Sequence, residues 1–278
     1  MTRLKAFASH LGISLVIFIV LLYLIIFIWY PPPFFSTDGG WQGIRIIIGV
    51  DLVLGPLLTL IVFKPGKPGL KFDLTMIGLI QAGALTWGIW TVHHQRAIVA
   101  VYVENYFAPV PLQEIKGQGM TPGKLKQFGQ HPPYWVFSNL PKDFNTLQKI
   151  RLDALRMGRP LYTFTRYYKP IDHEAIGIMR AKSLDMAEWV KGKPEAVQIY
   201  QTFIRKHKNE TNLIFLPWHG RDKYEIIAMN AATRRYVGRL DISPPKPNQK
   251  FPALDDNKKS ASSNAPHGKT AKPASTKK

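Results

Sequence analysis

One carboxylate lies inside an apolar stretch, where an ionisable group is costly and is a functional-site hypothesis by default. Asp51 is about seven residues inside the apolar run at 44–63. Three roles are open to it: it meets free backbone groups or a polar residue such as Gln81 of the next run, it binds a partner, or it relays protons. The relay has the weakest support, because these runs contain no second buried carboxylate that could accept the proton.

Arg45 and Pro56, on either side of Asp51 in the sequence, are further candidate site residues. Arg45 lies six residues earlier, which is about 120° around a helix, so we expect no direct ion pair between the two side chains. Arg45 can instead extend towards the membrane surface. Pro56 follows Gly55 in mid-run and predicts a kink, because proline removes a backbone donor.

Small residues repeat at four-residue spacing along the third apolar run, at Gly78, Ala82 and Thr86. Such a stripe lets another helix approach closely. It either packs the helices of this chain together, which we favour, or docks the membrane helix of a partner. The candidate partner-binding residues are therefore Asp51, Arg45, Pro56, Gly78, Gln81, Ala82 and Thr86.

The catalytic signals elsewhere are weak. Asp172, His173 and Glu174 form an acidic cluster with a histidine, but acidic residues are common at a helix N-terminus. His93 and His94 are adjacent, so they do not share a helix face, and no HExxH spacing accompanies them. No GxSxG, GxGxxG or GxxxxGK[ST] motif occurs. We therefore expect no catalytic, cofactor-binding or metal-binding residue and no enzymatic activity.

Basic and aromatic residues are mixed at 151–168, as they are in single-strand nucleic-acid sites. Core aromatics on a strand with exposed arginines explain the pattern equally well. Because we place this region outside the cytoplasm, DNA is a secondary target, and nucleic acid is not the expected partner. The residues are Arg151, Arg156, Arg159, Tyr162, Phe164, Arg166, Tyr167 and Tyr168.

The elements that position the candidate residues are three apolar runs at about 11–30, 44–63 and 74–92. Each run has the roughly 20 residues needed to cross about 30 Å of hydrocarbon. Trp29, Tyr30 and three prolines follow the first run, in place of a small-residue cleavage site. The first run is therefore expected to be an uncleaved anchor and not a signal peptide.

The distribution of Lys and Arg predicts the direction of the three spans. Lys64, Lys67 and Lys71 lie between the second and third runs, whereas the connection at 31–43 has neither Lys nor Arg. Positive charge in short loops marks the cytoplasmic side. We expect a multi-pass protein of the bacterial inner membrane, with the N-terminus in the cytoplasm and the domain after about residue 95 in the periplasm.

Residues 96–242 have the composition of a folded domain. The segment 97–254 holds 24 Lys or Arg against 13 Asp or Glu, a net charge of +11, and the chain has no cysteine for disulfides. The basic balance suits a nucleic acid, an anionic membrane or an acidic protein partner. The apolar patterns predict an α+β domain, with strands at 97–107, 134–139, 213–218, 224–229 and 235–242 and helices at 143–157, 173–190 and 194–207.

The last segment, 243–278, is rich in Pro, Ser and Lys. This composition cannot bury enough apolar surface to fold, so we expect a disordered basic tail. It is either simply solvated or makes weak, salt-sensitive contacts with anionic headgroups or glycan.

The sequence GVDLVLGPLLTLIVFKPGKPGLKFDL at 49–74 resembles the type IV pilin accessory proteins of the TfpX/TfpZ group. RLKAFASHL at 3–11, WYPPPFF at 29–35 and GGW at 39–41 are similar to that family's N-terminal entry, first outer loop and lead into the second span. The resemblance is specific over residues 3–94. Beyond them it holds only in general plan, including YEIIAMNAATRRYVGRLDI at 224–242.

This resemblance implies an inner-membrane protein that assists type IV pilus biogenesis and acts on the pilin before its assembly, as a chaperone or stability factor. A pilin waits in the membrane by its own hydrophobic N-terminal helix, which carries an acidic residue within the apolar stretch. The implied partners are type IV pilin, the pilus assembly machinery and membrane lipid. The oligomeric state is not predicted.

Two other classes of function compete with this reading. A membrane-anchored envelope enzyme acting on lipid or glycan should show paired carboxylates or a nucleophile with its base in the outer domain. A sensor or scaffold that passes a signal inward has little support, because the expected cytoplasmic parts are only short loops.

Overall fold

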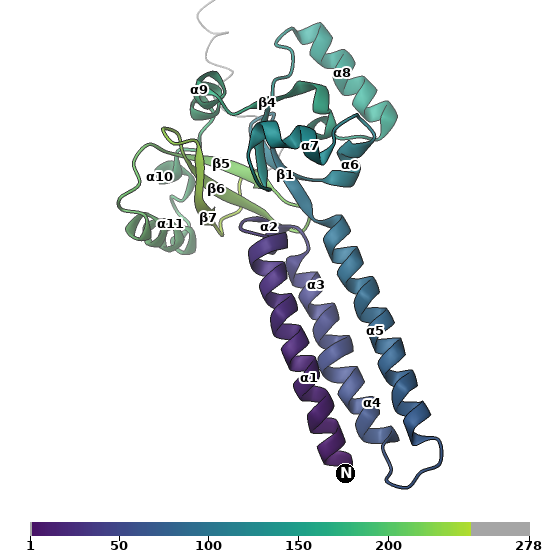
Figure 1. Cartoon of the computed structure of the whole chain (residues 1–278). Helices are drawn as coiled ribbons and strands as arrows, with labels where there is room; N and C mark the ends of the chain where they lie inside the picture. The colour runs from purple at the N-terminus through teal and green to yellow at the C-terminus, as the bar shows by residue number, and fades with distance from the viewer. Residues whose placement is uncertain (1, 246–278) are drawn as a thin grey trace, which may run out of the picture. The chain divides into compact units, whose positions relative to one another are not determined.

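A computed structural model describes residues 2–245 of the protein (Figure 1). The chain up to Pro244 forms one compact unit. Most of the expected tail at 243–278 lies outside the described residues, so its expected disorder stays a prediction.

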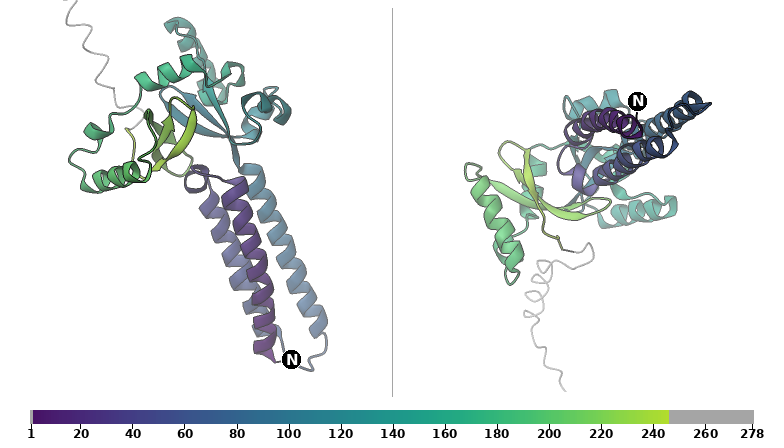
Figure 2. Two further views of the ribbon diagram at one scale, coloured as in Figure 1. Left: turned by 60° about the vertical axis from the view of Figure 1, so that its left-hand side comes forward. Right: turned by 90° about the horizontal axis from the view of Figure 1, so that it is seen from below.

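Three long helices at the N-terminal end lie side by side and form a bundle (Figures 1 and 2). By length and composition each can cross a membrane, with 27, 23 and 26 residues. The helices begin four to eight residues before the apolar runs that predict them, because a helix continues wherever its backbone hydrogen bonds can form. The first consists of α1 (Arg3–Tyr23) and η1 (Leu24–Trp29), the second of α3 (Gly40–Ile47), η2 (Ile48–Leu54) and α4 (Gly55–Val62), and the third of α5 (Leu70–Gln95).

Next to Pro56, where the sequence predicts a kink, the structure has a π-helical segment. Pro56 is the second residue of α4, and η2 directly before it is π-helical. Proline has no N–H to donate to the preceding turn, and a widened turn is one way in which a helix accommodates this loss. Asp51 lies within this widened turn.

A seven-stranded mixed sheet is the centre of the domain that follows Arg96 (Figure 1). Its strand order is β4-β3-β1-β2-β5-β6-β7. The pairs β1–β3 and β2–β5 are parallel, and the other neighbours are antiparallel. The strands predicted at 224–229 and 235–242 are confirmed and pair as a hairpin. The strands are β1 (Ala97–Val103), β2 (Tyr106–Pro111), β3 (Tyr134–Ser138), β4 (Tyr168–Pro170), β5 (Leu213–His219), β6 (Tyr224–Asn230) and β7 (Arg235–Leu240).

The prediction of a single strand over 97–107 is wrong. The segment is a hairpin that turns at Glu104 and Asn105, whose φ angles are 45° and 77°. Positive φ at both central residues is the requirement of the tight turn whose twist matches two antiparallel strands, and asparagine tolerates this conformation well. The continuous run of Val, Tyr and Phe hides the turn from a reading of hydrophobicity alone.

Helices surround the sheet, and α8 matches its predicted ends. Asp143 accepts a hydrogen bond from the Thr146 N–H at 2.8 Å, and Gly158 ends the helix with a φ of 60°. Aspartate is a favoured N-cap residue and glycine a favoured left-handed C-cap residue, so both ends of the helix follow from local sequence. The helices are α2 (Phe34–Thr37), α6 (Leu112–Lys116), α7 (Pro122–Leu125), α8 (Phe144–Met157), α9 (His173–Ala181), α10 (Met186–Trp189) and α11 (Pro194–Lys206), with short 3-10 turns at 126–128, 161–163 and 165–167.

The prediction of one helix over 173–190 is also wrong, because the chain breaks between α9 and α10. The Asp185 carboxylate accepts hydrogen bonds from the backbone N–H groups of Ala187 and Glu188, which makes it the N-cap of α10. The Ser183 hydroxyl accepts from the Phe215 N–H of β5 at 2.9 Å. Polar side chains thus compete with the helix for backbone groups and end it early.

The bundle and the sheet share one hydrophobic core. Leu21, Ile25, Ile44 and Ile47 of the first two long helices belong to the same buried cluster as Trp218 of β5. The connection at 30–39, which contains α2, joins the two parts. This connection therefore links the first two long helices and also packs against the sheet.

Candidate functional site

The structure brings Asp51 and Gln81 together inside the bundle. The Gln81 Nε2 donates to Asp51 Oδ1 at 2.6 Å and to the Asp51 backbone oxygen at 3.3 Å. Asp51 is 2 % exposed. Asp51 Oδ2 and Gln81 Oε1 are buried and have no hydrogen-bond partner among the described residues. Of the roles open to Asp51, the structure shows the contact with Gln81, and this contact leaves two acceptors unsatisfied.

Gly55 makes room for this pair. A Cβ atom at position 55 would overlap the amide of Gln81, so any larger residue would displace that side chain. A groove of about 150 Å³ lies beside the amide, between the second and third long helices. Its wall is apolar except for Gln81, and it is lined by Val50, Leu54, Gly55, Leu58, Ile77, Ile80, Gln81 and Ala84.

Two further candidates lie close in sequence to the pair but play different parts. Arg45 is exposed, with its guanidinium carbon 6.0 Å from the ring centre of Trp41, and forms no ion pair with Asp51. Pro56 is buried next to Gly55 and shapes the helix that carries the pair. Neither residue lines the groove.

The small-residue stripe faces away from the other helices of the bundle. Gly78, Ala82 and Thr86 are all exposed, and a Cβ added at Gly78 would meet no atom within 4 Å. Our preferred expectation, that the stripe packs the three helices together, is therefore wrong. Hydrophobic spacing alone could not tell which side of α5 faces the bundle, because α5 is apolar around most of its circumference.

A second polar contact within the bundle was missed by the sequence reasoning. His10 Nδ1 of α1 lies 2.6 Å from the Thr59 hydroxyl of α4, which also contacts the Gly55 carbonyl at 3.1 Å. The buried Ser14 lies one turn along α1. The signal was available as polar residues at four-residue spacing, 10 and 14, on an otherwise apolar face.

The sequence reasoning also missed a buried polar junction between the bundle and the sheet. Trp218 Nε1 donates to the Thr37 hydroxyl at 2.9 Å, and the Asp222 N–H donates to the Thr37 carbonyl at 2.8 Å. Asp38 accepts from the Arg221 N–H at 3.1 Å and contacts the Thr37 hydroxyl. Thr37 and Asp38 are 0 % and 4 % exposed. The connection at 30–39 is therefore held to the β5–β6 turn by hydrogen bonds as well as by apolar contacts.

The buried Asp38 carboxyl predicts a pH dependence of stability. Burial raises its pKa from 3.8 to about 6, although hydrogen bonds from Thr37 and Arg221 and the charge of Arg221 oppose the rise, and the charge of Asp222 adds to it. The folded chain then keeps a proton that the unfolded chain has lost, so the free energy of unfolding falls as the pH rises from about 4 to about 6. The full difference is roughly 3 kcal/mol.

We expect Asp38→Asn to remove this pH dependence, because the amide does not titrate. Urea unfolding of the detergent-purified chain at pH 4.5 and pH 7 measures it. The wild-type chain should lose more stability than the variant between the two values. Equal losses in the two proteins would show that Asp38 is not the responsible group.

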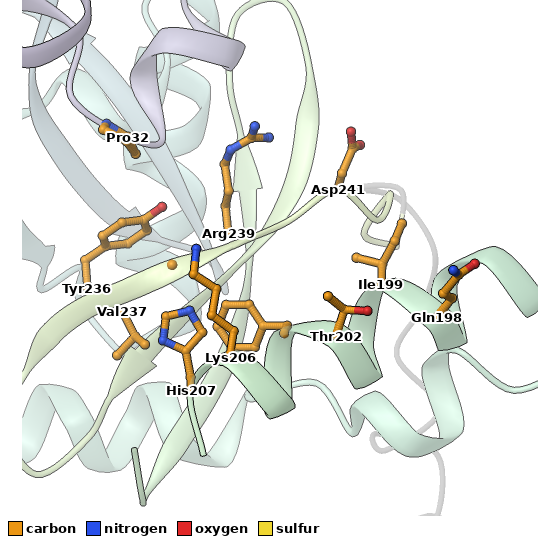
Figure 3. Close-up of a pocket in the computed structure, with 12 residues that line it drawn as sticks. Pro32, Gln198, Ile199, Thr202, Lys206, His207, Tyr236, Val237, Arg239 and Asp241 are labelled. Carbon is orange, nitrogen blue, oxygen red and sulfur yellow. The ribbon is translucent and has the colours of Figure 1, made fainter. Parts of the chain in front are cut away.

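A larger cavity lies in the outer domain, between α11 and the edge strand β7 (Figure 3). Its volume is about 690 Å³. Asp241 is the only carboxylate among the described residues that line it, and Asp241 Oδ1 accepts a hydrogen bond from Lys223 at 2.5 Å. The lining thus lacks the two carboxyl groups on which most glycoside hydrolases depend.

The other catalytic candidates are engaged in structure. Asp172 accepts from the Ala175 N–H at 2.8 Å as the N-cap of α9. The rings of His93 and His94 pack on Trp29 and Trp90, with centroids 5.1 Å and 4.3 Å apart. Within residues 2–245, no three His, Cys, Asp or Glu side chains gather as they would to hold a metal ion.

The mixed basic and aromatic segment is divided between core and surface. Phe164 and Tyr168 are buried, and the Tyr168 hydroxyl donates to the Tyr162 carbonyl at 2.5 Å. The Arg166 guanidinium lies over the ring of Tyr167, 4.8 Å from its centre. This arrangement matches core aromatics with exposed arginines and offers no row of exposed rings on which bases could stack.

Comparison with known proteins shows similarity to fimbrial assembly proteins. A family model described as fimbrial assembly protein FimB matches residues 1–39. Three fimbrial assembly proteins of Dichelobacter nodosus, those of serogroup I, serogroup E1 and serogroups C1 and C2, are 34% identical to the chain over 101 residues. No solved structure shows a significant match.

The matched region is 35% of this chain. It spans 39% of the length of the serogroup I and E1 proteins and 76% of the protein of serogroups C1 and C2. The chain therefore belongs to the family of fimbrial assembly proteins.

Proposed function

We propose that this chain is a non-enzymatic accessory protein of the bacterial inner membrane that holds type IV pilin before its assembly, as a chaperone or stability factor. Its family membership supports a role in fimbrial biogenesis. The observation that carries the finer proposal is the Asp51–Gln81 pair, which lies beside an open apolar groove within the bundle.

The chemistry of the pair suits a partner helix. Asp51 Oδ2 and Gln81 Oε1 lack donors among the described residues, and a buried unsatisfied polar group costs about 1–3 kcal/mol. The hydrocarbon core of a membrane holds no water to supply a donor. Gln81 lines the groove, so a small rotation of its amide can bring Oε1 to the acidic residue of a pilin helix, which supplies a donor in its protonated form. Neighbouring apolar side chains of that helix enter the groove.

The exposed stripe on α5 is a second surface of the bundle that suits helix packing. Gly78 and Ala82 present little side chain, so the backbone of a second helix can approach α5 closely there. At 100° per residue the stripe lies about 150° around α5 from the residues of this helix that line the groove, so one helix cannot cover both. We assign the groove to the pilin helix, and the stripe offers a separate face to a second helix.

The proposed topology places the groove in the inner membrane. Lys64, Lys67 and Lys71 mark the turn between the second and third long helices as cytoplasmic, and the domain after Gln95 then lies in the periplasm. Alkaline phosphatase fused after Pro244 should be active in cells. An inactive fusion, together with a fluorescent cytoplasmic reporter at the same position, would overturn this topology.

Site-specific photocrosslinking tests the function. A photoreactive residue at Leu58 or Ile80, both on the groove, should capture the pilin in intact cells. The same residue at Val16, which is 63% exposed on α1, should capture much less and serves as the matched control. Equal or absent capture at these positions would overturn the proposed contact.

Deletion of the gene distinguishes this proposal from an envelope enzyme. We expect less pilin and fewer surface fimbriae, with the lipid and glycan composition of the envelope unchanged. A change in lipid or glycan with normal pilin would favour the enzymatic alternative.

A further inference from the structure

The helix α8 exposes an unusual amount of apolar surface. Beyond residue 96, six large apolar side chains are exposed in the described part of the chain, and four of them lie on this one helix. Phe144, Leu152 and Leu155 are 68%, 52% and 77% exposed. At 100° per residue they fall within about 80° of one another, so they form a single stripe along the helix. Concentrated apolar exposure of this kind marks an interaction surface.

A cleft adjoins the end of this stripe. It has a volume of about 470 Å³ and lies between the C-terminal end of α8 and the β1–β2 turn, with Leu155, Leu161 and Arg159 in its wall. The left-handed Gly158 turns the chain there, and the Arg159 N–H donates to the Ala154 carbonyl at 2.9 Å. The cleft thus offers an apolar recess next to the basic side chain of Arg159.

The charges around the stripe are mainly basic. Lys149 and Arg156 flank it on one side, and Arg151 on the other is paired with Glu104 at 2.5 Å. Lys149 and Arg159 take part in no ion pair among the described residues. Carboxylates of a partner can therefore pair with these two cations while its apolar side chains cover the stripe.

Two other occupants fit less well. The bundle lies at the opposite end of the domain from α8, so the membrane that would hold the bundle is out of reach of the stripe (Figures 1 and 2). A second copy of this chain would bring together two domains of net charge +11 at a basic face, which opposes self-association.

We propose that the stripe Phe144–Leu152–Leu155 and the adjoining cleft bind a segment of the pilin's soluble part that presents apolar side chains next to carboxylates. This inference rests on the proposed function, since it takes the pilin as the partner. It adds a second contact, outside the membrane, to the one in the bundle.

The test is a photoreactive residue at Leu155 of the full chain in intact cells, with the exposed Lys208 as the control position. We expect capture of the pilin from position 155 but not from 208. Two further variants, L152E and the charge-reversed pair K149E/R159E, should each lower capture from position 155 by about tenfold. Because these positions are exposed or basic surface positions, thermal unfolding should be unchanged.

The outcomes separate the two proposals. Capture at Leu58 without capture at Leu155 would overturn the α8 inference and leave the intramembrane contact standing. Absence of capture at both would overturn both. A crosslink from Leu155 to a second copy of the chain would show that α8 serves self-association instead.

Discussion

The double variant D51L/Q81L is expected to abolish surface fimbriae while the chain accumulates at its normal level. Replacing both members of a hydrogen-bonded pair with apolar residues leaves no unsatisfied group behind. Removal of an intramembrane carboxylate should also favour insertion of the second span, by about 3 kcal/mol. The variant thus fits lipid better than the natural chain and lacks only the polar anchor.

Immunoblots of the chain, together with electron microscopy or shear assays of fimbriae, measure this result. Thr75→Leu is the matched control, because Thr75 is an exposed polar residue on the same helix α5. Q81L alone should be less abundant than the double variant, since it leaves the Asp51 carboxylate without its donor. Normal fimbriae in D51L/Q81L would show that the pair is a packing feature and would remove the main support for the proposed function.

The second large effect is expected at Trp218. Its ring is 0 % exposed, packs edge-on against Phe34 at 5.1 Å between centroids and donates to the Thr37 hydroxyl. Trp218→Ala leaves a cavity where the bundle and the sheet meet, and it should cost about 3–5 kcal/mol of unfolding free energy. Trp218→Phe keeps most of the apolar contact and loses the hydrogen bond, so it should cost about 1–2 kcal/mol.

Denaturant unfolding of the detergent-purified chain, followed by tryptophan fluorescence and by limited proteolysis, checks both values. Trp41→Ala is the control, since Trp41 is 52% exposed and should change stability little. If W218A and W41A were equally stable, the connection at 30–39 would not hold the sheet to the bundle.

The two groups of buried polar residues, one in the bundle and one where it meets the sheet, differ in how well the sequence predicts them. Asp51 and Gln81 stand out in the sequence because polar groups are rare in long apolar runs, and a contact between them was one of few ways to satisfy both. Thr37 and Asp38 give no such signal, because Ser, Thr, Asp and Gly are ordinary in a connecting loop. Their burial follows from the sheet, whose residue Trp218 lies 181 positions further along the chain.

The sequence by itself determined the three long apolar helices, the caps of α8, the final hairpin and the mixed class of the outer domain. These features depend on local periodicity, on capping residues and on the length of apolar runs, and each of these signals can be seen within a short stretch of sequence. The turn at Glu104 and Asn105 and the break at Asp185 were missed, because apolar or helix-compatible residues on either side concealed them.

Only the tertiary structure decided which face of each element is covered. The stripe at Gly78, Ala82 and Thr86 and the apolar side chains of α8 look like core residues in the sequence, yet both are exposed. A periodic pattern defines a face but does not say what packs on it, since that depends on contacts between residues far apart in the chain. The α8 stripe, which we assign to the pilin, and the α5 stripe are both faces that the described part of the chain leaves uncovered.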